Sequence, residues 1–130
     1  WGPALDAYRR AIARWPDYAT LVSECDRMLA ELGGPADARR ELLYDKLHPS
    51  LADNDAIAVR RADLALATGQ FAAGLAQVAQ RQFHPGEGRF DTHRLFVRLN
   101  IREGERLAAA GDWRAALEHF RQAHLHPKLR

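Results

Sequence analysis

Residues 104–123 read GERLAAAGDWRAALEHFRQA and carry the clearest structural signal in the chain. Small and large apolar residues recur there at intervals of three and four, which places them on one face of a helix. Gly111 and Asp112 interrupt this pattern, since glycine ends a helix in the left-handed conformation and aspartate caps the helix that follows. The stretch therefore predicts two helices joined by a tight turn.

The second half of this pattern occurs four times. Each copy has a small residue, a large apolar residue four positions later, and a proline seven or eight residues after that. The copies are Ala4, Tyr8 and Pro16; Ala38, Leu42 and Pro49; Gly74, Val78 and Pro85; and Ala116, Phe120 and Pro127. The interval between successive prolines grows along the chain from 33 to 36 to 42 (49 − 16, 85 − 49 and 127 − 85). Because proline cannot continue a helix, each copy closes one repeat of helix, turn and helix.

Turn signals precede the last three copies at Gly33, Gly69 and Gly111, where a left-handed glycine is expected. A longer connection, 86–92, precedes the sixth expected helix, and Asp91 or Thr92 is its expected N-cap. Long loops on a repeat scaffold often carry function, but insertions there are also well tolerated. The sequence leaves both interpretations of this loop open.

We therefore expect an all-α fold, a right-handed solenoid of antiparallel helix pairs. Seven helices are expected, at 3–14, 18–32, 36–47, 55–67, 71–82, 91–109 and 113–125. Single helices of this length are marginal in water, so stacking on neighbours must stabilise them. Residues 1–130 are expected to form one helical repeat domain, with units at 1–16 (partial), 17–49, 50–85 and 86–130. Because the chain starts within a repeat, we expect it to be a fragment of a longer protein.

This framework resembles the tetratricopeptide repeat. Its small, aromatic and apolar positions are matched over one whole unit by Gly104, Leu107, Gly111, Asp112, Trp113, Ala116, Phe120 and Ala123. The match covers essentially the whole chain, although Arg61 and Glu103 stand where the family usually has leucine and Asn100 where it prefers a large apolar residue. The resemblance implies a right-handed array that serves as a scaffold for protein binding.

The run 81–85, followed by Gly86-Glu87-Gly88, is also similar to the repeat region of a family of large bacterial proteins. In that family such repeats follow a β-rich domain reminiscent of carbohydrate-acting enzymes. Its members carry a tryptophan-glutamate-glycine run after the His-Pro, and this sequence lacks that tryptophan. The resemblance implies a carbohydrate-related parent protein.

Charge and composition argue against several classes of partner. The chain has 19 basic and 17 acidic side chains, a balance that does not favour nucleic acid or an anionic membrane. The sequence has no apolar run long enough to span a bilayer and no secretory signal, and a cytoplasmic location is expected. Cys25, the single cysteine, is expected to be a buried apolar side chain because Leu21, Met28 and Leu29 surround it at helical spacing.

The sequence offers no catalytic constellation, and we expect neither an enzyme nor a cofactor. His119, His124 and His126 are spaced by five and two, which does not suit a metal site on one helical face. The His-Pro pairs at 48–49, 84–85 and 126–127 recur at the repeat junctions, where histidine is expected to cap the end of a helix.

A helical array presents a concave face lined by the first helix of each pair, and this face is the expected site. Its residues carry mixed charges, which favours a polar or zwitterionic protein or peptide segment, or an upstream domain of the same polypeptide. The candidate contact residues are Thr20, Ser23, Arg27, Asp63, Arg98 and Glu105. The expected function is a non-catalytic interaction module; the alternatives are an accessory segment that shapes or covers the active site of a carbohydrate-active enzyme, and self-association.

Overall fold

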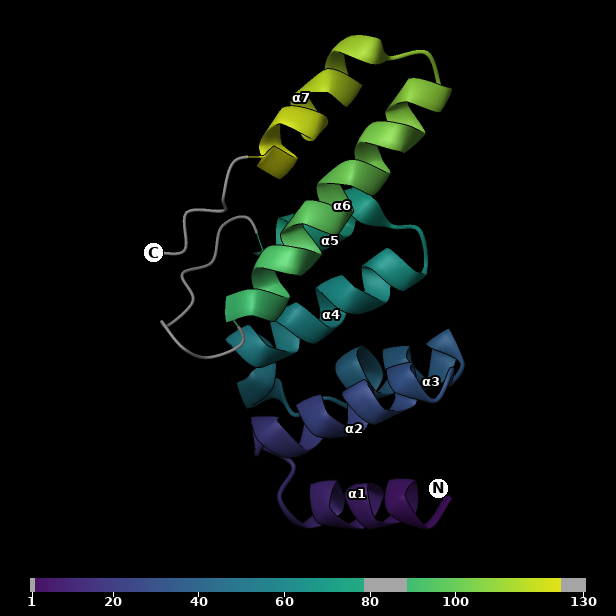
Figure 1. Ribbon diagram of the computed structural model, residues 1–130. Helices are drawn as coiled ribbons and strands as arrows, with labels where there is room; N and C mark the ends of the chain where they lie inside the picture. The colour runs from purple at the N-terminus through teal and green to yellow at the C-terminus, as the bar shows by residue number, and fades with distance from the viewer. Residues whose placement is uncertain (1, 79–88, 125–130) are drawn as a thin grey trace. The chain divides into compact units, whose positions relative to one another are not determined.

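The computed structural model describes residues 2–78 and 89–124, without the side chains of 89–91 and 124. Within those ranges all regular structure is helical, which confirms the all-α prediction (Figure 1). The elements are α1 (Gly2–Arg14), α2 (Ala19–Glu31), α3 (Ala36–Arg40), η1 (Glu41–Asp45), η2 (Pro49–Leu51), α4 (Asp55–Ala67), α5 (Phe71–Val78), α6 (Arg89–Ala109) and α7 (Trp113–His124). The chain divides into two compact units, residues 1–64 and 65–130, with the boundary inside α4.

Three of the turns between helices are built in the same way. Gly33, Gly69 and Gly111 have φ angles of 67°, 77° and 87°, so the left-handed conformation predicted at these glycines is confirmed. In each turn the residue after the glycine donates its amide hydrogen to a carbonyl five residues back, as Asp112 does to Leu107 over 2.9 Å. The glycine itself donates a second hydrogen bond to the carbonyl three residues back, as Gly111 does to Ala108 over 3.0 Å. The two hydrogen bonds satisfy the last carbonyls of the first helix, and the turn leads the chain into the second helix.

Polar side chains cap the first turns of two helices, α4 and α7. The Asn54 side chain accepts hydrogen bonds from the amides of Ala56 and Ile57 at the start of α4, and Asp112 accepts one from Ala115 at the start of α7. The predicted cap of α6 at Asp91 or Thr92 is wrong, because α6 already begins at Arg89 and both residues lie within it.

The helix expected at 36–47 changes its winding along its length. It begins as α3 and continues as the π-helical segment η1, whose end is marked by a hydrogen bond from the Lys46 amide to the Glu41 carbonyl. The Arg61 guanidinium donates two hydrogen bonds to the Leu43 carbonyl, at 3.0 and 2.8 Å, and stacks over the Tyr44 ring. Arg61 therefore has a polar role at a position where leucine was the expected residue.

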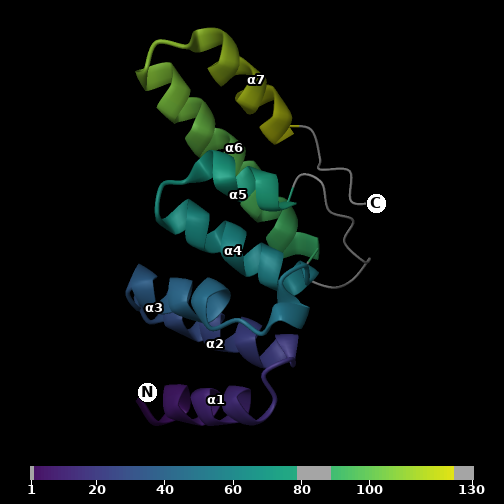
Figure 2. The ribbon, with the colours of Figure 1, turned by 180° about the vertical axis from the view of Figure 1, so that it is seen from behind.

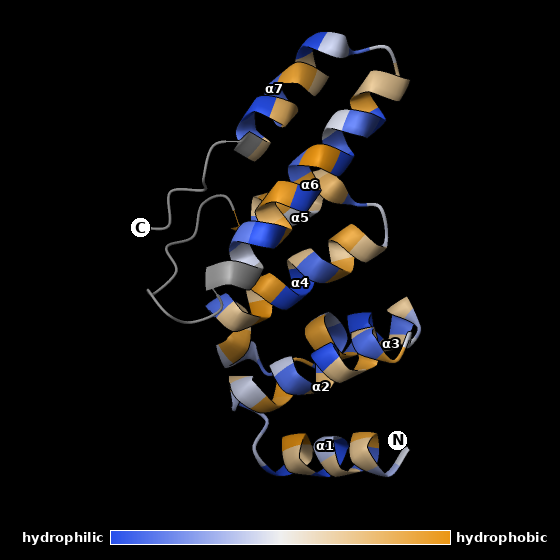
Figure 3. Cartoon of the chain, viewed as in Figure 1, coloured by the Kyte–Doolittle hydropathy of each residue, from blue (hydrophilic) through white to orange (hydrophobic). Residues whose placement is uncertain are grey.

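The first unit holds two adjoining apolar clusters. The larger joins α2, η1, η2 and α4 through the buried side chains of Val22, Leu43, Leu51, Ile57 and Leu64. The smaller joins α1 to α2 through Leu5, Cys25 and Leu29. Figure 3 shows the apolar bands alternating with polar ones along α1, as expected for a helix with one buried face.

The second unit relies on close helix contacts at two glycines. A Cβ atom placed on Gly74 of α5 would lie 2.7 Å from the Leu99 Cδ2 atom of α6, and one on Gly104 of α6 would lie 2.5 Å from the Phe120 ring of α7. Ala116 is also buried. The predicted packing role of the small residues is thus met at Gly74 and Ala116, whereas Ala4 and Ala38 are only half-buried. Within residues 2–78 and 89–124, no helix has the length and apolar character needed to cross a membrane.

Candidate functional site

The first unit contains an open groove of about 600 Å³ beside α1, α2 and the α3–η1 segment. In Figure 2, which shows the chain from behind, α2 lies between α1 and α3. The groove residues are Leu5, Arg9, Ile12, Ala13, Pro16, Val22, Cys25, Leu29, Ala38, Glu41, Leu42, Lys46, Leu47 and His48. They come from α1, the turn between α1 and α2, α2 itself, and the stretch from α3 to the residue before η2.

Most of the groove is apolar. Leu5, Val22, Cys25 and Leu29 are buried members of the two core clusters, so the same side chains that hold α1 and α2 together also form the floor. Leu42 is half-buried and packs against both clusters. The floor is therefore fixed by the folding of this unit and is present before anything binds.

Charged side chains lie at the edge of the groove. Lys46 forms an ion pair with Glu41, and its hydrogen bond to that carboxylate lowers the Glu41 pKa; the Arg9 charge lowers it slightly further. Arg9 is exposed, and within the part of the chain that the structure describes no ion pair is found for it. The edge thus offers a positive charge from Arg9 beside an apolar floor.

The Cys25 thiol lies in the floor and is 2% exposed, which confirms the prediction of a buried apolar side chain. Burial raises the thiol pKa, the Arg9 charge lowers it, and the Asp26 charge raises it again, with a net rise.

This environment should be visible in the reactivity of the thiol. Reaction of Cys25 with a disulfide reagent should be slower in the native protein than in guanidinium chloride, and its pH midpoint should lie higher, because the thiolate is the reactive form and burial disfavours it. Arg9→Ala should raise the midpoint further, and Arg10→Ala, which alters a neighbouring arginine outside the groove, should not. A native midpoint at or below that of the unfolded chain would contradict this description of the floor.

A buried ionic network joins α2 and α3, two of the helices that line the groove, to α4. Asp26 of α2 accepts two hydrogen bonds from Arg39 of α3, at 2.8 and 3.0 Å, and one from Arg60 of α4 at 2.6 Å. Both arginines also donate to Asp63, at 2.8 and 3.2 Å. Burial by itself lowers the Arg39 pKa, but the hydrogen bonds and charges of Asp26 and Asp63 outweigh it and raise the pKa. The network therefore joins three helices through two shared carboxylates.

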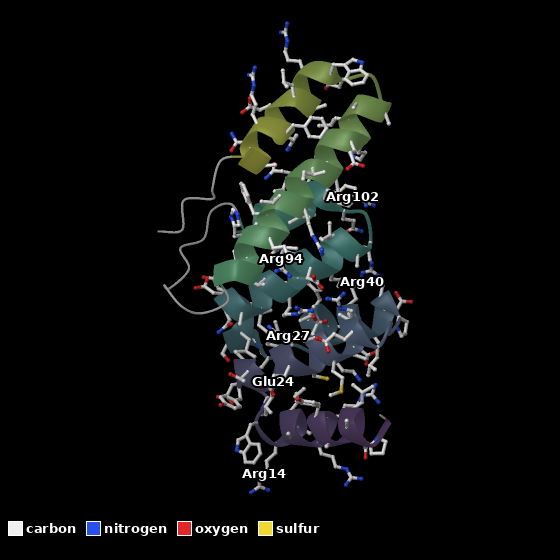
Figure 4. All side chains as sticks on the ribbon, in the orientation of Figure 1. Arg14, Glu24, Arg27, Arg40, Arg94 and Arg102 are labelled. Carbon is white, nitrogen blue, oxygen red and sulfur yellow. The ribbon has the colours of Figure 1, made fainter. Side chains whose placement is uncertain are left out.

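Five of the six residues proposed from the sequence occupy matching helix positions; Ser23 has no counterpart among them. Thr20 and Arg98 have the same offset from the turn glycine that follows each of them (33 − 20 equals 111 − 98), and Arg27, Asp63 and Glu105 each lie six before one. Thr20, Ser23 and Arg27 follow one another along α2, where Figure 4 labels Arg27 and its neighbour Glu24. Arg98 and Glu105 are exposed on α6 in the second unit. None of the six lines the groove.

Asp63 has a structural role in addition to any contact it makes with a partner. Its side chain is 36% exposed, but its carboxylate accepts hydrogen bonds from the two buried arginines. Reversing the charge of Asp63 would therefore disturb the network, and such a variant cannot serve as a clean test of binding. The sequence does not single out the side chains that line the groove. The apolar face of the helix expected at 3–14 is the one sequence feature that points to them.

In the second unit, Asn100 and Glu103 stand at positions where the repeat pattern expects apolar residues, and both side chains have polar partners. Asn100 donates to the Phe96 carbonyl at 3.1 Å, and its side-chain oxygen lies 3.0 Å from His119 Nδ1, so this nitrogen carries the hydrogen. Glu103 is buried and forms an ion pair with Arg106. These partners explain why Asn100 and Glu103 are tolerated where the repeat pattern expects apolar residues.

His48 has a local structural role. The His48 ring accepts a hydrogen bond from the Ser50 amide, so it caps the start of η2, whereas the sequence predicts that it caps the end of a helix. His84, His126 and the side chain of His124 lie outside the described residues. In the described part of the chain, no group of three histidine, cysteine or acidic side chains is placed to hold a metal ion.

Comparison with protein-family models, with curated proteins and with solved structures finds no match to this chain.

Proposed function

We propose that the chain is a non-catalytic helical module of tetratricopeptide type that binds a segment of a protein in the groove of its first unit. The observation that supports this most is the combination of an apolar floor with a charged edge in one preformed hollow. Its volume of about 600 Å³ lies in the range of about 300–1,000 Å³ that is typical of ligand sites.

A peptide suits this groove better than a small polar molecule does. Within the described residues every buried side-chain nitrogen or oxygen atom already has a hydrogen-bond partner, and the floor side chains Leu5, Val22 and Leu29 carry no such atom for a polar ligand. Apolar side chains of a bound segment would gain from burial on the floor, at about 25 cal/mol per Å² of apolar surface removed from water. An acidic side chain beside them would meet Arg9, so the expected segment combines apolar anchors with a nearby carboxylate.

A displayed random-peptide library selected on the full chain tests this proposal. Enriched peptides should carry apolar residues next to an aspartate or glutamate, and their affinity should fall at least about tenfold, or roughly 1.4 kcal/mol, when Ala13→Trp fills the groove. Ala13 is an exposed groove residue of α1, so a larger side chain there occupies space without replacing a core contact.

Ala7→Trp is the matched control, because Ala7 is also exposed on α1 but does not line the groove. Arg9→Glu should weaken the same peptides, whereas Arg10→Glu should have little effect. The proposal fails if no peptide is enriched, or if the enriched peptides bind the Ala13→Trp and Ala7→Trp variants equally well.

A further inference from the structure

The π-helical turn of η1 decides which side chains reach the edge of the groove. Its last hydrogen bond runs from the Lys46 amide to the Glu41 carbonyl five residues back, over 2.8 Å. In an α-helix these two positions would lie about 140° apart around the axis, on nearly opposite sides. Here their side chains form an ion pair, and both line the groove. The charged pair at the groove edge therefore depends on the winding of η1.

Arg61 of α4 binds a backbone carbonyl within this turn. The last carbonyls of a helix have no amide partner inside the helix. The Leu43 carbonyl of η1 accepts hydrogen bonds from Arg61 Nε at 3.0 Å and from Arg61 Nη2 at 2.8 Å. Continued α-helical winding would instead pair this carbonyl with the Leu47 amide. Arg61 thus supplies the donors that a regular helix would take from its own backbone.

The other contacts of Arg61 hold its guanidinium in place at this turn. The group lies 4.1 Å from the centre of the Tyr44 ring, and Nη1 donates to the Ala52 carbonyl at 3.5 Å. Among the described residues its hydrogen-bond partners are all backbone carbonyls, and no carboxylate pairs with it. The side chain therefore serves the backbone around η1, not a charge network.

We propose that Arg61 is a positioning residue of the groove: its hydrogen bonds to the Leu43 carbonyl maintain the π-helical turn that carries residues 46–48 to the groove edge. Without these donors, α-helical winding satisfies the carbonyl through the Leu47 amide. The residues after the turn then rotate by about 100° around the helix axis and leave their places along the groove. Arg61 does not line the groove itself and acts through these residues.

The turn also determines which charge of the groove edge is open to a peptide. Because Lys46 pairs with Glu41, the exposed Arg9 is left to meet a peptide carboxylate. The Arg9 charge already lowers the Glu41 pKa, so a Glu41 released from Lys46 would compete for Arg9 and repel an acidic peptide. Loss of Arg61 should therefore weaken the binding of acidic peptides. This consequence, unlike the winding itself, rests on the proposed function of the groove.

Through-hydrogen-bond NMR correlations of the full chain test the winding without a ligand. In the parent protein the Lys46 amide nitrogen should correlate with the Glu41 carbonyl carbon. In Arg61→Met, which keeps a long side chain but removes every donor, it should correlate with the Leu42 carbonyl, its α-helical partner. Arg61→Lys keeps a donor and should retain the Glu41 correlation. Tyr44→Leu, which removes only the ring under the guanidinium, should retain it too.

Peptides selected from the library test the consequence for binding. Arg61→Met should bind them several-fold more weakly than the parent protein, whereas Arg61→Lys and Tyr44→Leu should bind them about as tightly as the parent. A rewound turn with unchanged peptide affinity would overturn the role of Arg61 in binding.

The correlation by itself decides the positioning role. A Glu41 correlation that persists in Arg61→Met overturns the proposal. An Arg61→Met chain that is unfolded by circular dichroism overturns it as well, because Arg61 would then hold the whole unit and not one turn. If no peptide is enriched on the parent protein, the proposed function fails, and the partner of the Lys46 amide still shows whether Arg61 sets the winding.

Discussion

Replacing Asp26 with alanine is expected to destabilise the first unit by about 3–5 kcal/mol, because it removes the fully buried one of the two carboxylates that the buried Arg39 and Arg60 share and leaves them the partly exposed Asp63. Both guanidiniums are almost fully buried, and solvent cannot replace the lost hydrogen bonds without opening the packing of α2, α3 and α4. The free energy of unfolding, from urea denaturation followed by circular dichroism, measures the effect.

Asp37→Ala is the control for this experiment. Asp37 also forms an ion pair with an arginine of α3, Arg40, but its side chain is almost fully exposed, so its removal should change the unfolding free energy little. A triple variant that replaces Asp26, Arg39 and Arg60 by apolar residues of similar size should recover much of the stability lost in Asp26→Ala. An Asp26→Ala protein as stable as the Asp37→Ala protein would contradict the buried network.

Replacing Leu99 with alanine is expected to cost the second unit about 2–5 kcal/mol, because Leu99 is fully buried and its removal leaves a cavity against α5. Leu117→Ala makes the same chemical change at the half-exposed edge of α7 and should cost much less. Thermal and urea unfolding of both variants provide the comparison.

The contact of Leu99 with Gly74 adds a sharper test. An added Cβ at Gly74 would lie 2.7 Å from Leu99 Cδ2, so Gly74→Ala should overpack this contact at a cost of about 1–3 kcal/mol, offset in part by the better helix propensity of alanine. In the double variant the methyl group enters space vacated by Leu99. The two changes together should therefore cost less than their sum, whereas strict additivity would mean that the two residues do not touch.

The positions of the helices could be predicted because local signals fix them. Gly33, Gly69 and Gly111 end their helices in a conformation that other residues rarely adopt, and the apolar spacing between these glycines is helical. The winding of η1 could not be predicted in this way. It accompanies the Arg61 guanidinium that caps the Leu43 carbonyl, and residue 61 comes from a different helix.

The buried network and the groove depend on contacts between residues far apart in the sequence. The sequence shows arginine pairs at 39–40 and 60–61 near acidic residues, but an exposed and a buried arginine look alike there. The structure separates them: Arg39 and Arg60 share Asp26, whereas Arg40 pairs with the exposed Asp37. The groove likewise needs α1 and η1 on either side of α2, an arrangement that helical periodicity alone does not specify.

The proposed groove therefore differs from the concave face that the repeat pattern predicts as the binding site. The expected face, with Thr20 and Arg27 on α2, carries polar side chains and offers little apolar surface. The groove offers both an apolar floor and the exposed Arg9, and its floor is part of the core. We propose binding at the groove because burial of apolar side chains supplies most of the affinity of peptide complexes, whereas exposed charges mainly influence rate and specificity.

Methyl chemical-shift mapping of the full chain with a peptide selected from the library tests this claim most directly. The expected result is that the methyl groups of Leu5, Ile12, Val22 and Leu42 shift on binding and show contacts to the apolar side chains of the peptide, while Leu99 stays unchanged. A shift of the Thr20 methyl group without shifts of Leu5, Ile12 and Leu42, or shifts confined to the methyl groups of the second unit, would contradict the assignment of the groove as the binding site.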